Sequence, residues 1–509
     1  MKRKIDYKLI VIIIITILSR IILLGAYPGG IHADEAFAGY EAYSLANYGT
    51  DSWGYTFPVY LPVWGSGMSA LESYLMIPFV ALWGLNSVTV KIPQMLLGIL
   101  SVYVFYLLLK TIYNRNIAYW GAFLLAISPW HIMMSRFGMD CNLTPALILL
   151  GVYFAVCSFD KPHYLILSVI FWGCSLYAYA VNWLFVPLFL TGCLVYCLKH
   201  KKILCSWNLV MSGALLFLLA IPLFLFIAVN AGIITEIVTP FISIPQLAVY
   251  RGNEITLSNT VMYLLKLIRL FLTQNDHSPW NVIKGFGIYY IYSTPFVIYG
   301  IYIVIKHFIE NTKQKVFSYD FIILWWLLSG IIVALLQGVG INRLNMVHPV
   351  MFIFLAIGIQ EICKKWKKKV QYILIGIYLV SFLIFEAFYF TGFQKQISNI
   401  QHTGLKEALD YAQEISSDEQ MIHVTNSIRH SQVLFYLQYP TTDYMDTVKW
   451  SVEDGVREVV VHGFGSFSWD WDIDSLEAGV YVIVANDATE YEDQGYKVTI
   501  FDNCAVAEK

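Results

Sequence analysis

The stretch Gly29-Gly-Ile-His-Ala-Asp-Glu-Ala-Phe-Ala-Gly-Tyr40 places two adjacent carboxylates directly after a hydrophobic run, Leu9–Leu24. A charged residue at the centre of a membrane helix costs roughly 2.5–3.5 kcal/mol on insertion scales. Two charges where a hydrophobic run ends therefore predict a polar site at a membrane surface. The pair Asp34-Glu35 is the first place along the chain where such a site can form.

The composition predicts a membrane protein with many spans. The chain has 509 residues, of which 58% are hydrophobic and 13% charged, with a mean hydropathy of +0.61. These values exclude a soluble globular domain. The 8 cysteines form neither a disulfide framework nor a CxxC metal motif. Cys193 and Cys197 share a helix face but have no His or acidic neighbours, so we expect no metal there.

Eleven segments are apolar and close to the roughly 20 residues that a bilayer requires. The first has no small-residue cleavage site after it, so we interpret it as an uncleaved helix. The predicted spans cover residues 9–24, 88–109, 117–134, 143–158, 164–180, 184–198, 207–230, 286–305, 319–338, 346–363 and 370–391.

The basic loops predict the orientation of these helices, because Lys and Arg are enriched on the cytoplasmic side. Five basic clusters fall on one side if the helices alternate: Lys2 to Lys4, Lys110 with Arg115, Lys199 to Lys202, Lys306 to Lys315, and Lys364 to Lys369. The N-terminus is then cytoplasmic. The first loop (27–87), the loop Gly232–Lys284 and the tail after Phe393 are extracytoplasmic.

We therefore expect two domains, a transmembrane domain over residues 1–393 and a small extracytoplasmic α/β domain over 394–509. The tail has strand-like runs at 421–425, 458–462 and 481–485 and an amphipathic helix at Leu405–Ile415. Within the first loop, Ser69–Leu85 is apolar but short and broken by proline, which predicts a helix lying in the membrane interface. An additional span there would invert every later loop, so we reject that alternative.

Polar side chains gather at the helix ends that this topology places outside. They are Asp34, Glu35, Lys91, Arg136, Asp140, Asn182, Asp276, His277, Asn342, Arg343, Asn345 and His348. Structural roles are open for several of them. Lys91 and Arg136 could extend to the interface, Asp140 could cap the following helix, and the Asp34-Glu35 pair could cap a surface helix from Ala36.

The first loop and its surroundings resemble GT-C glycosyltransferases, above all the protein O-mannosyltransferase and aminoarabinose-transferase families. The resemblance rests on the order and spacing of five pieces in the N-terminal third. They are Pro28-Gly-Gly-Ile-His-Ala-Asp-Glu-Ala-Phe-Ala-Gly-Tyr40, Gly65-Ser-Gly-Met-Ser-Ala-Leu-Glu-Ser-Tyr-Leu75, Ile77-Pro-Phe-Val-Ala-Leu-Trp-Gly-Leu85, Val90-Lys-Ile-Pro-Gln-Met-Leu-Leu-Gly-Ile-Leu100, and Ala126-Ile-Ser-Pro-Trp-His-Ile-Met-Met-Ser-Arg136.

The resemblance implies a GT-C fold and a donor sugar linked through phosphate to a polyprenol. It implies that Asp34 is the general base, with Glu35 as its support and Asp140 as a second acidic residue. The donor phosphate would meet Arg136, Arg343 or Lys91, because the lysine that many bacterial relatives carry near Gly65–Met68 is absent here. Further candidates for substrate binding are His32, Tyr40, Asn342, His348, Asp276 and His277.

The expected reaction is an inverting transfer of the sugar to an acceptor hydroxyl of a protein, lipid or glycan. Phosphate is a good leaving group, so the transfer requires a base and cations but no cofactor or metal. Adjacent carboxylates do not suit a retaining mechanism, which uses two carboxylates about 5 Å apart on opposite sides of the sugar. A flippase of lipid-linked glycans is the alternative, and it predicts internal repeats and broken helices at mid-membrane. In the tail, Trp469 or Trp471 could stack on an acceptor sugar or pack in the domain core.

Overall fold

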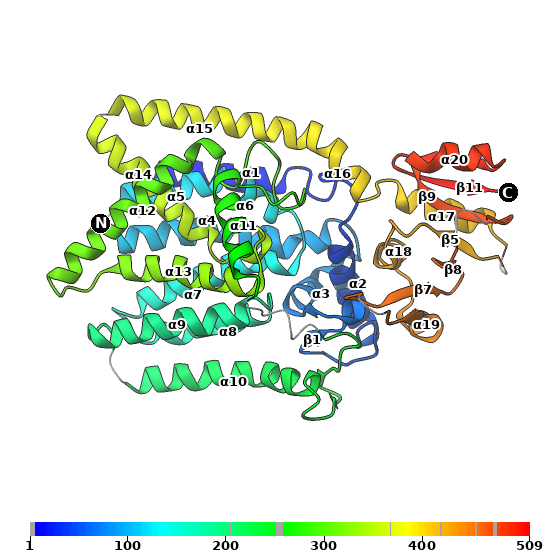
Figure 1. Ribbon diagram of the computed structural model, residues 1–509, viewed down its shortest axis with the longest axis horizontal. Coiled ribbons are helices and arrows are strands. Elements are labelled where there is room, and N and C mark those ends of the chain that lie inside the picture. Colours follow the sequence, from blue (N-terminus) through cyan, green and yellow to red (C-terminus); the bar gives the residue numbers. More distant parts are fainter. Residues whose placement is uncertain are drawn as a thin grey trace. The chain divides into compact units, whose positions relative to one another are not determined.

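The computed structural model of the chain describes residues 6–203, 206–250, 258–366, 368–417, 420–453, 456–471 and 476–509 (Figure 1). The predicted basic residues Lys2 to Lys4 and Lys367 lie outside these ranges, as does Asp472. The chain forms two compact units. The first contains Met1–Ile22, Gln94–Ile221 and Asn253–Phe388, and the second contains Leu23–Pro93, Pro222–Gly252 and Tyr389–Lys509.

The first unit is a bundle of long apolar helices. Its helices are α1 (Tyr7–Ile21), α4 (Ile92–Ile112), α5 (Arg115–Ala126), α6 (Pro129–Met134), α7 (Thr144–Cys157), α8 (Tyr164–Leu176), α9 (Asn182–Lys199), α10 (Trp207–Asn230), α11 (Thr260–Thr273), α12 (Thr294–Lys313), α13 (Tyr319–Gln337), α14 (His348–Trp366) and α15 (Lys368–Phe388). Helices α4 and α10 each have one end in the second unit. Every predicted span therefore contains a helix or, for 117–134, two short ones.

Among the described residues, seven helices are long and apolar enough to cross a membrane. The composition and these helices make the chain a membrane protein. Other helices of the bundle, such as α1 with 15 residues and α8 with 13, are shorter than a full span. The count of eleven spans stays a prediction.

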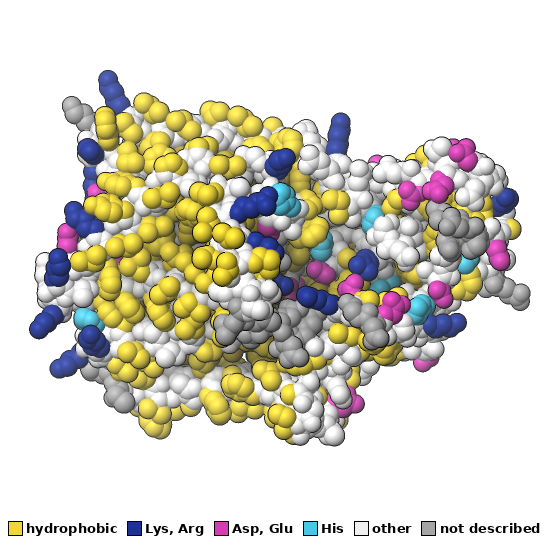
Figure 2. Space-filling view, in the orientation of Figure 1, with side chains coloured by type: hydrophobic (Ala, Val, Ile, Leu, Met, Phe, Trp, Pro, Cys, Tyr) yellow, Lys and Arg dark blue, Asp and Glu magenta, His cyan; other side chains and the backbone are white. Residues whose placement is uncertain are grey.

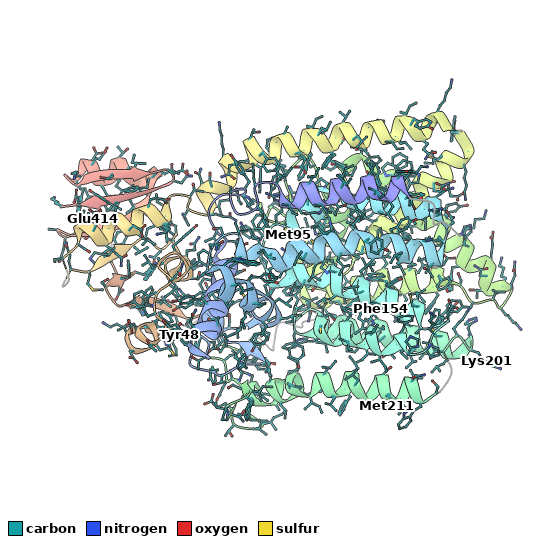
Figure 3. The ribbon with its side chains drawn as sticks, turned by 180° about the vertical axis from the view of Figure 1, so that it is seen from behind. Tyr48, Met95, Phe154, Lys201, Met211 and Glu414 are labelled. Carbon is teal, nitrogen blue, oxygen red and sulfur yellow. The ribbon has the colours of Figure 1, made fainter. Side chains whose placement is uncertain are left out.

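The surface of the first unit is divided between apolar and basic side chains. Figure 2 shows hydrophobic side chains over its visible face and Lys and Arg side chains gathered at the end near the N-terminus. Viewed from behind, Lys201 lies at the α9–α10 connection and Met95 lies toward the opposite end of the bundle (Figure 3). This segregation fits helices that alternate in direction, as the basic loops predict.

The second unit combines the first loop with the C-terminal tail. The loop forms α2 (Ala33–Tyr48), a two-stranded sheet of β1 (Tyr60–Leu61) and β2 (Met68–Ser69), the 3₁₀ turn η1 (Val63–Gly65), α3 (Leu71–Trp83) and η2 (Thr89–Lys91). A second hairpin pairs β3 (Ile237–Val238) with β4 (Ser243–Ile244). The predicted helix within 69–85 is thus present as α3, which contains Pro78.

The tail is an α/β domain, as predicted. After the π-helical turn Tyr389–Phe393 come α16 (Gln394–Ile400), α17 (Leu405–Ile415), α18 (His430–Leu437), α19 (Thr441–Thr447) and α20 (Ala488–Asp493). The described strands form one sheet in the order β10-β11-β9-β5-β8-β7-β6. They are β5 (Ile422–Val424), β6 (Lys449–Ser451), β7 (Val460–Phe464), β8 (Phe467–Ser468), β9 (Val480–Val484), β10 (Lys497–Phe501) and β11 (Cys504–Glu508).

The two faces of this sheet belong to different cores, because alternate side chains of a strand point to opposite faces. Along β9, Tyr481 and Ile483 pack with Tyr491 of α20. Val480 and Val482 belong to a second core with Leu409 of α17. That second core continues into the first loop and includes Ile31, Ala36, Phe37 and Tyr40. The loop and the tail therefore fold together as one body.

Candidate functional site

Asp34 lies in the first turn of α2. His32 is the N-cap of this helix, and its Nδ1 accepts the backbone N–H of Asp34 at 3.2 Å. The helix thus begins at Ala33 and is capped by His32, so it starts three residues before the position considered from the sequence. A carboxylate in the first turn is stabilised by the helix dipole. The Asp34 side chain is 40% exposed, so its carboxylate is accessible to a substrate.

An aromatic residue of the first loop orients the Asp34 carboxylate. The indole N–H of Trp64 donates to Asp34 Oδ1 at 3.2 Å. The other oxygen, Oδ2, lies 3.9 Å from Nδ1 of His32. One oxygen is therefore held by an N–H donor. No sequence pattern singles out Trp64 among the 15 tryptophans of the chain.

Glu35 points away from this exposed position. Its Oε2 lies 3.9 Å from Nζ of Lys91, and both side chains are fully buried. Burying two charges is costly unless they compensate each other. The two adjacent carboxylates therefore have different surroundings. Lys91 lies against Glu35 inside the protein and does not extend to the interface.

A second carboxyl pair, not identified from the sequence, is formed by Glu41 of α2 and Asp51 of the loop that follows it. Glu41 accepts hydrogen bonds from the backbone N–H of Ser52 at 2.8 Å and from its hydroxyl. Asp51 Oδ1 accepts the N–H groups of Trp53 and Tyr55. Both side chains are buried. Burial raises the pKa of Glu41 to about 7, and burial together with the Glu41 charge raises the pKa of Asp51.

Tyr40, a predicted substrate-binding residue, is also buried. Its hydroxyl donates to the carbonyl of Tyr439 at 2.9 Å. This contact joins α2 to the tail, so it favours a structural role for Tyr40 over contact with a substrate.

Arg136 belongs to the first unit and is fully buried. Its guanidinium donates to the carbonyls of Ser19 and Arg20 at 3.2 and 3.1 Å. These carbonyls end α1, where a positive charge complements the helix dipole. The contacts favour a structural role for Arg136 over the predicted contact with a donor phosphate.

Asp140 opens a 3₁₀ turn, Asp140–Leu143, and its Oδ1 accepts the N–H of Cys141 at 2.6 Å. Asn345 attaches this turn to the segment before α14, because its amide donates to the carbonyl of Cys141 at 3.0 Å. Trp130 of α6 donates in turn to Asn345 Oδ1 at 3.1 Å. The predicted second acidic residue thus lies half-buried in a hydrogen-bonded framework.

Apart from His277, the remaining candidates of the first unit lie around residue 341. Asp276 Oδ2 accepts the N–H of Ile341 at 2.9 Å, and Nε2 of His348 lies 3.0 Å from the Ile341 carbonyl. Asn342 accepts the N–H of Arg343, whose guanidinium donates to the carbonyl of Gln337. His277 lies on the surface, and its Nε2 is 3.3 Å from Nη2 of Arg269. Asp276 and His348 therefore fix loops, while Arg343 is only half-buried.

The structure thus gathers the predicted residues into two groups, one in each unit. His32, Asp34, Glu35, Tyr40 and Lys91 belong to the second unit, and the other predicted site residues belong to the first: Arg136, Asp140, Asp276, His277, Asn342, Arg343 and His348. The tail tryptophans behave as core residues. Trp469 and Trp471 donate to the carbonyls of Ile428 and Val424, which favours packing over sugar stacking.

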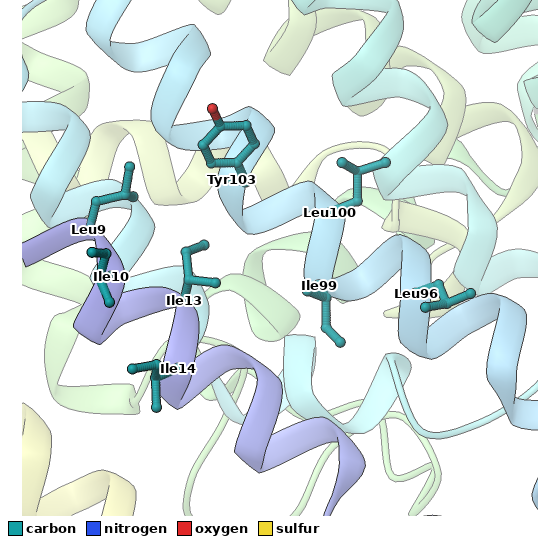
Figure 4. Close-up of a pocket in the computed structure, with 8 residues that line it drawn as sticks. All are labelled: Leu9, Ile10, Ile13, Ile14, Leu96, Ile99, Leu100 and Tyr103. Atoms are coloured by element: carbon teal, nitrogen blue, oxygen red, sulfur yellow. The ribbon is translucent and has the colours of Figure 1, made fainter. Parts of the chain in front are cut away.

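An apolar groove between α1 and α4 is a separate feature of the first unit (Figure 4). It is lined by Leu9, Ile10, Ile13, Ile14, Leu96, Ile99, Leu100 and Tyr103. Apart from the Tyr103 hydroxyl, these side chains carry no polar group. The groove suits contact with hydrocarbon chains and has no residue for catalysis.

Comparison with known proteins identifies the fold and finds a family match over part of the chain. Residues 70–226 match the family model of dolichyl-phosphate-mannose-protein mannosyltransferases. The chain is 30% identical over 141 residues to dolichyl-phosphooligosaccharide-protein glycotransferase 2 of Pyrococcus furiosus, which is 26% of this chain and 18% of that relative. The chain therefore spans less than a fifth of the relative's length.

Solved structures of ArnT from Cupriavidus metallidurans share the fold along almost the whole chain. The apo structure matches with a TM-score of 0.57 and 12% identity, over 98% of this chain and 97% of ArnT. The structure bound to undecaprenyl phosphate matches with a TM-score of 0.58 and 10% identity, over 99% and 98%.

The family-model match over residues 70–226 and the fold shared with ArnT agree with the resemblance to the protein O-mannosyltransferase and aminoarabinose-transferase families seen in the sequence.

Proposed function

We propose that the protein is an inverting glycosyltransferase that uses a polyprenyl-phosphate-linked sugar and acts at the outer face of the cytoplasmic membrane. The observation that carries the proposal is the Asp34 carboxylate, which is exposed, stands at a helix N-terminus and is held on one oxygen by Trp64. The lipid phosphate bound by the ArnT of the same fold supports a donor of this class.

In the proposed reaction, the acceptor oxygen attacks the anomeric carbon of the donor sugar. The bond from that carbon to the phosphate oxygen breaks, and its electron pair leaves on the phosphate. The acceptor proton passes to Asp34, whose Oδ2 is not the oxygen bound by Trp64. One displacement inverts the anomeric centre. No cofactor or metal is needed, because phosphate already leaves readily.

A cation must compensate the charge that develops on the phosphate. Of the three candidates, Lys91 and Arg136 are fully buried, whereas Arg343 is half-buried. Arg343 is therefore the most exposed of the three candidate cations for a donor phosphate. Its planar guanidinium can bind phosphate through two N–H groups, which a lysine cannot do.

The test compares the glycolipids and envelope glycans of a deletion strain after complementation. Wild-type protein restores a sugar that is absent from the deletion strain, and Asp34→Asn restores it roughly 10²- to 10⁴-fold more slowly, the usual contribution of a general base. Asp443→Asn is the matched control, because Asp443 is an exposed aspartate of the same unit.

Undiminished transfer by Asp34→Asn would contradict the proposed base. Movement of lipid-linked glycan across the membrane without any sugar transfer by the wild type would favour the alternative, a flippase. The anomeric configuration of donor and product, determined by NMR, separates an inverting from a retaining transfer.

A further inference from the structure

Trp64 has an unusual backbone that the C-terminal domain holds in place. It lies in η1 with φ of 59°, a left-handed conformation that costs a residue with a side chain of the order of 1 kcal/mol or more. Its carbonyl accepts the N–H of Val459 at 2.8 Å. The next residue, Gly65, has φ of 66°, and a Cβ there would lie 2.3 Å from Val459 Cγ1. The turn η1 therefore packs closely against Val459, the residue before β7.

The indole of Trp64 is enclosed by side chains from both α2 and the C-terminal domain. The rings of Phe37 and His430 approach it with centroid distances of 4.7 and 5.2 Å. Phe37 and His430 also contact each other, at 5.1 Å, so the three rings form one cluster. Burial in this cluster, with the Arg429 charge adjacent, lowers the pKa of His430 to about 3. His430 is therefore neutral at physiological pH and acts as an aromatic neighbour.

A cation of the C-terminal domain covers the indole. The guanidinium carbon of Arg429 lies 5.5 Å from the centroid of the Trp64 ring, within the range of a cation–π interaction. Arg429 is itself held by Glu458, whose Oε1 lies 3.3 Å from Nη2 of Arg429. Arg429 precedes α18, and Glu458 precedes β7. Two separate segments of the C-terminal domain thus contact one residue of the first loop: Arg429 contacts the Trp64 indole, and Val459 contacts the Trp64 backbone.

From these contacts we infer that the C-terminal domain positions the catalytic carboxylate. Arg429, Glu458 and Val459 fix Trp64, and the indole N–H of Trp64 fixes Asp34. Trp64 and Arg429 are positioning residues, since they act through Asp34. The inference rests on the proposed function of Asp34, and it assigns the tail a part in the reaction.

The Trp64→Phe variant tests this inference directly. Phenylalanine keeps an aromatic ring for Phe37, His430 and Arg429 but removes the N–H that binds Asp34. The rate at saturating donor should fall roughly 10- to 100-fold, the usual effect of losing a residue that orients a reacting group. The half-saturating amount of donor should change little. Trp53→Phe is the matched control, because Trp53 packs on Trp450 in the same unit.

Donor and acceptor are supplied together as membranes of a deletion strain, which hold the unused lipid-linked sugar and the unmodified acceptor. Release of polyprenyl phosphate in these membranes measures turnover whichever sugar the lipid carries. Thermal unfolding in detergent accompanies each assay, and the midpoint of Trp64→Phe should stay within about 2 °C of wild type, less than the shift that 1 kcal/mol causes in most domains.

If Trp64→Phe does not fold, variants of Arg429 test whether the C-terminal domain positions Asp34. Arg429→Gln removes the cation and should lower turnover, while Arg429→Lys keeps a cation near the ring and should restore much of it. Wild-type turnover in both Trp64→Phe and Arg429→Gln overturns the positioning role. If Asp34→Asn is inactive in the same experiment, the proposed function stands without this inference. If Asp34→Asn is also fully active, both fail.

Discussion

At the scale of single residues, Asp34 and Glu35 show how neighbours on one helix turn acquire different roles. Successive helical residues point about 100° apart, so one carboxylate can face the surface while the next faces the core. Asp34 is 40% exposed, whereas Glu35 is buried against Lys91. The sequence supported this division because neighbouring residues on one segment point in different directions, but the approach of Lys91 to Glu35 is a property of the fold.

The Glu35–Lys91 pair makes a prediction about stability. Removing one member takes away the charged partner that lies 3.9 Å from the other buried charge, and breaking a buried ion pair in this way typically costs 3–5 kcal/mol. We expect Glu35→Gln and Lys91→Met each to lower the free energy of unfolding by roughly 3 kcal/mol, and the double variant to recover most of that loss. Thermal unfolding of the four proteins in detergent measures the coupling.

The same four proteins separate a structural from a phosphate-binding role of Lys91. If Lys91 only compensates Glu35, the stable double variant should require the same amount of donor as the wild type. A weaker affinity for the donor in a stably folded double variant would contradict this and return Lys91 to the donor site. Equal stability of all four proteins would show that the Glu35–Lys91 pair contributes nothing to the free energy of unfolding.

At the scale of elements, α2 carries two ionisable features about two turns apart. Its N-terminus presents Asp34, while Glu41, two turns later, faces the buried Asp51 loop. The sequence identified the first feature because two charges follow an apolar run. It did not identify the second, because a lone glutamate in a helix is usually a solvated residue. Only the fold brings residue 51 back to residue 41.

The buried Glu41 predicts a pH-dependent stability. Its pKa rises from 4.5 to about 7 in the folded protein. The folded state therefore holds this proton where the unfolded state has lost it, and stability should fall as pH increases from 4.5 to 7. Below 4.5 both states are protonated, and above 7 both have lost the proton.

Glu41→Gln should remove the contribution of Glu41 and leave that of the buried Asp51. Glutamine can accept the Ser52 N–H and donate to the Ser52 hydroxyl without a charge. We expect the variant to be as stable as wild type near pH 4.5 and more stable near pH 8, by an amount on the order of 1 kcal/mol or more. Unfolding midpoints of both proteins across this range measure it. Parallel curves for the two proteins would show that Glu41 is not the titrating group.

Local patterns predicted only part of the elements. Apolar runs predicted most helices of the first unit, alternation predicted β5, β7 and β9, and an amphipathic pattern predicted α17, whereas α11, α18, α19, α20, β6, β8, β10 and β11 were not predicted. The turn η1 has no such pattern, since its left-handed Trp64 is maintained by Val459 almost four hundred residues later. Local propensity disfavours that conformation, and the tertiary contacts override it. A site residue that depends on distant contacts cannot be located from its own neighbourhood.

At the scale of the whole molecule, the sequence separated membrane from tail but did not group the chain as the structure does. The predicted boundary at 393/394 lies near Tyr389, where the last segment of the second unit begins. That unit also contains the first loop, however, because Ile31 and Phe37 share a core with Leu409 and Val482. A change in composition along the chain shows where the chain leaves the membrane. It does not show that the first loop and the tail share a core, because that depends on which of their surfaces pack together.

The orientation of the whole molecule in the membrane gives the last prediction. If the basic loops are cytoplasmic, the turn at Lys201–Lys202 lies inside the cell and the turn at Gln494–Gly495 lies outside. Both turns are exposed and should accept an epitope tag. Antibody should bind the tag at 494 on intact spheroplasts and the tag at 201 only after permeabilisation. The opposite result would place Asp34 on the cytoplasmic side and exclude a reaction at the outer face, since the loop and the tail share one core.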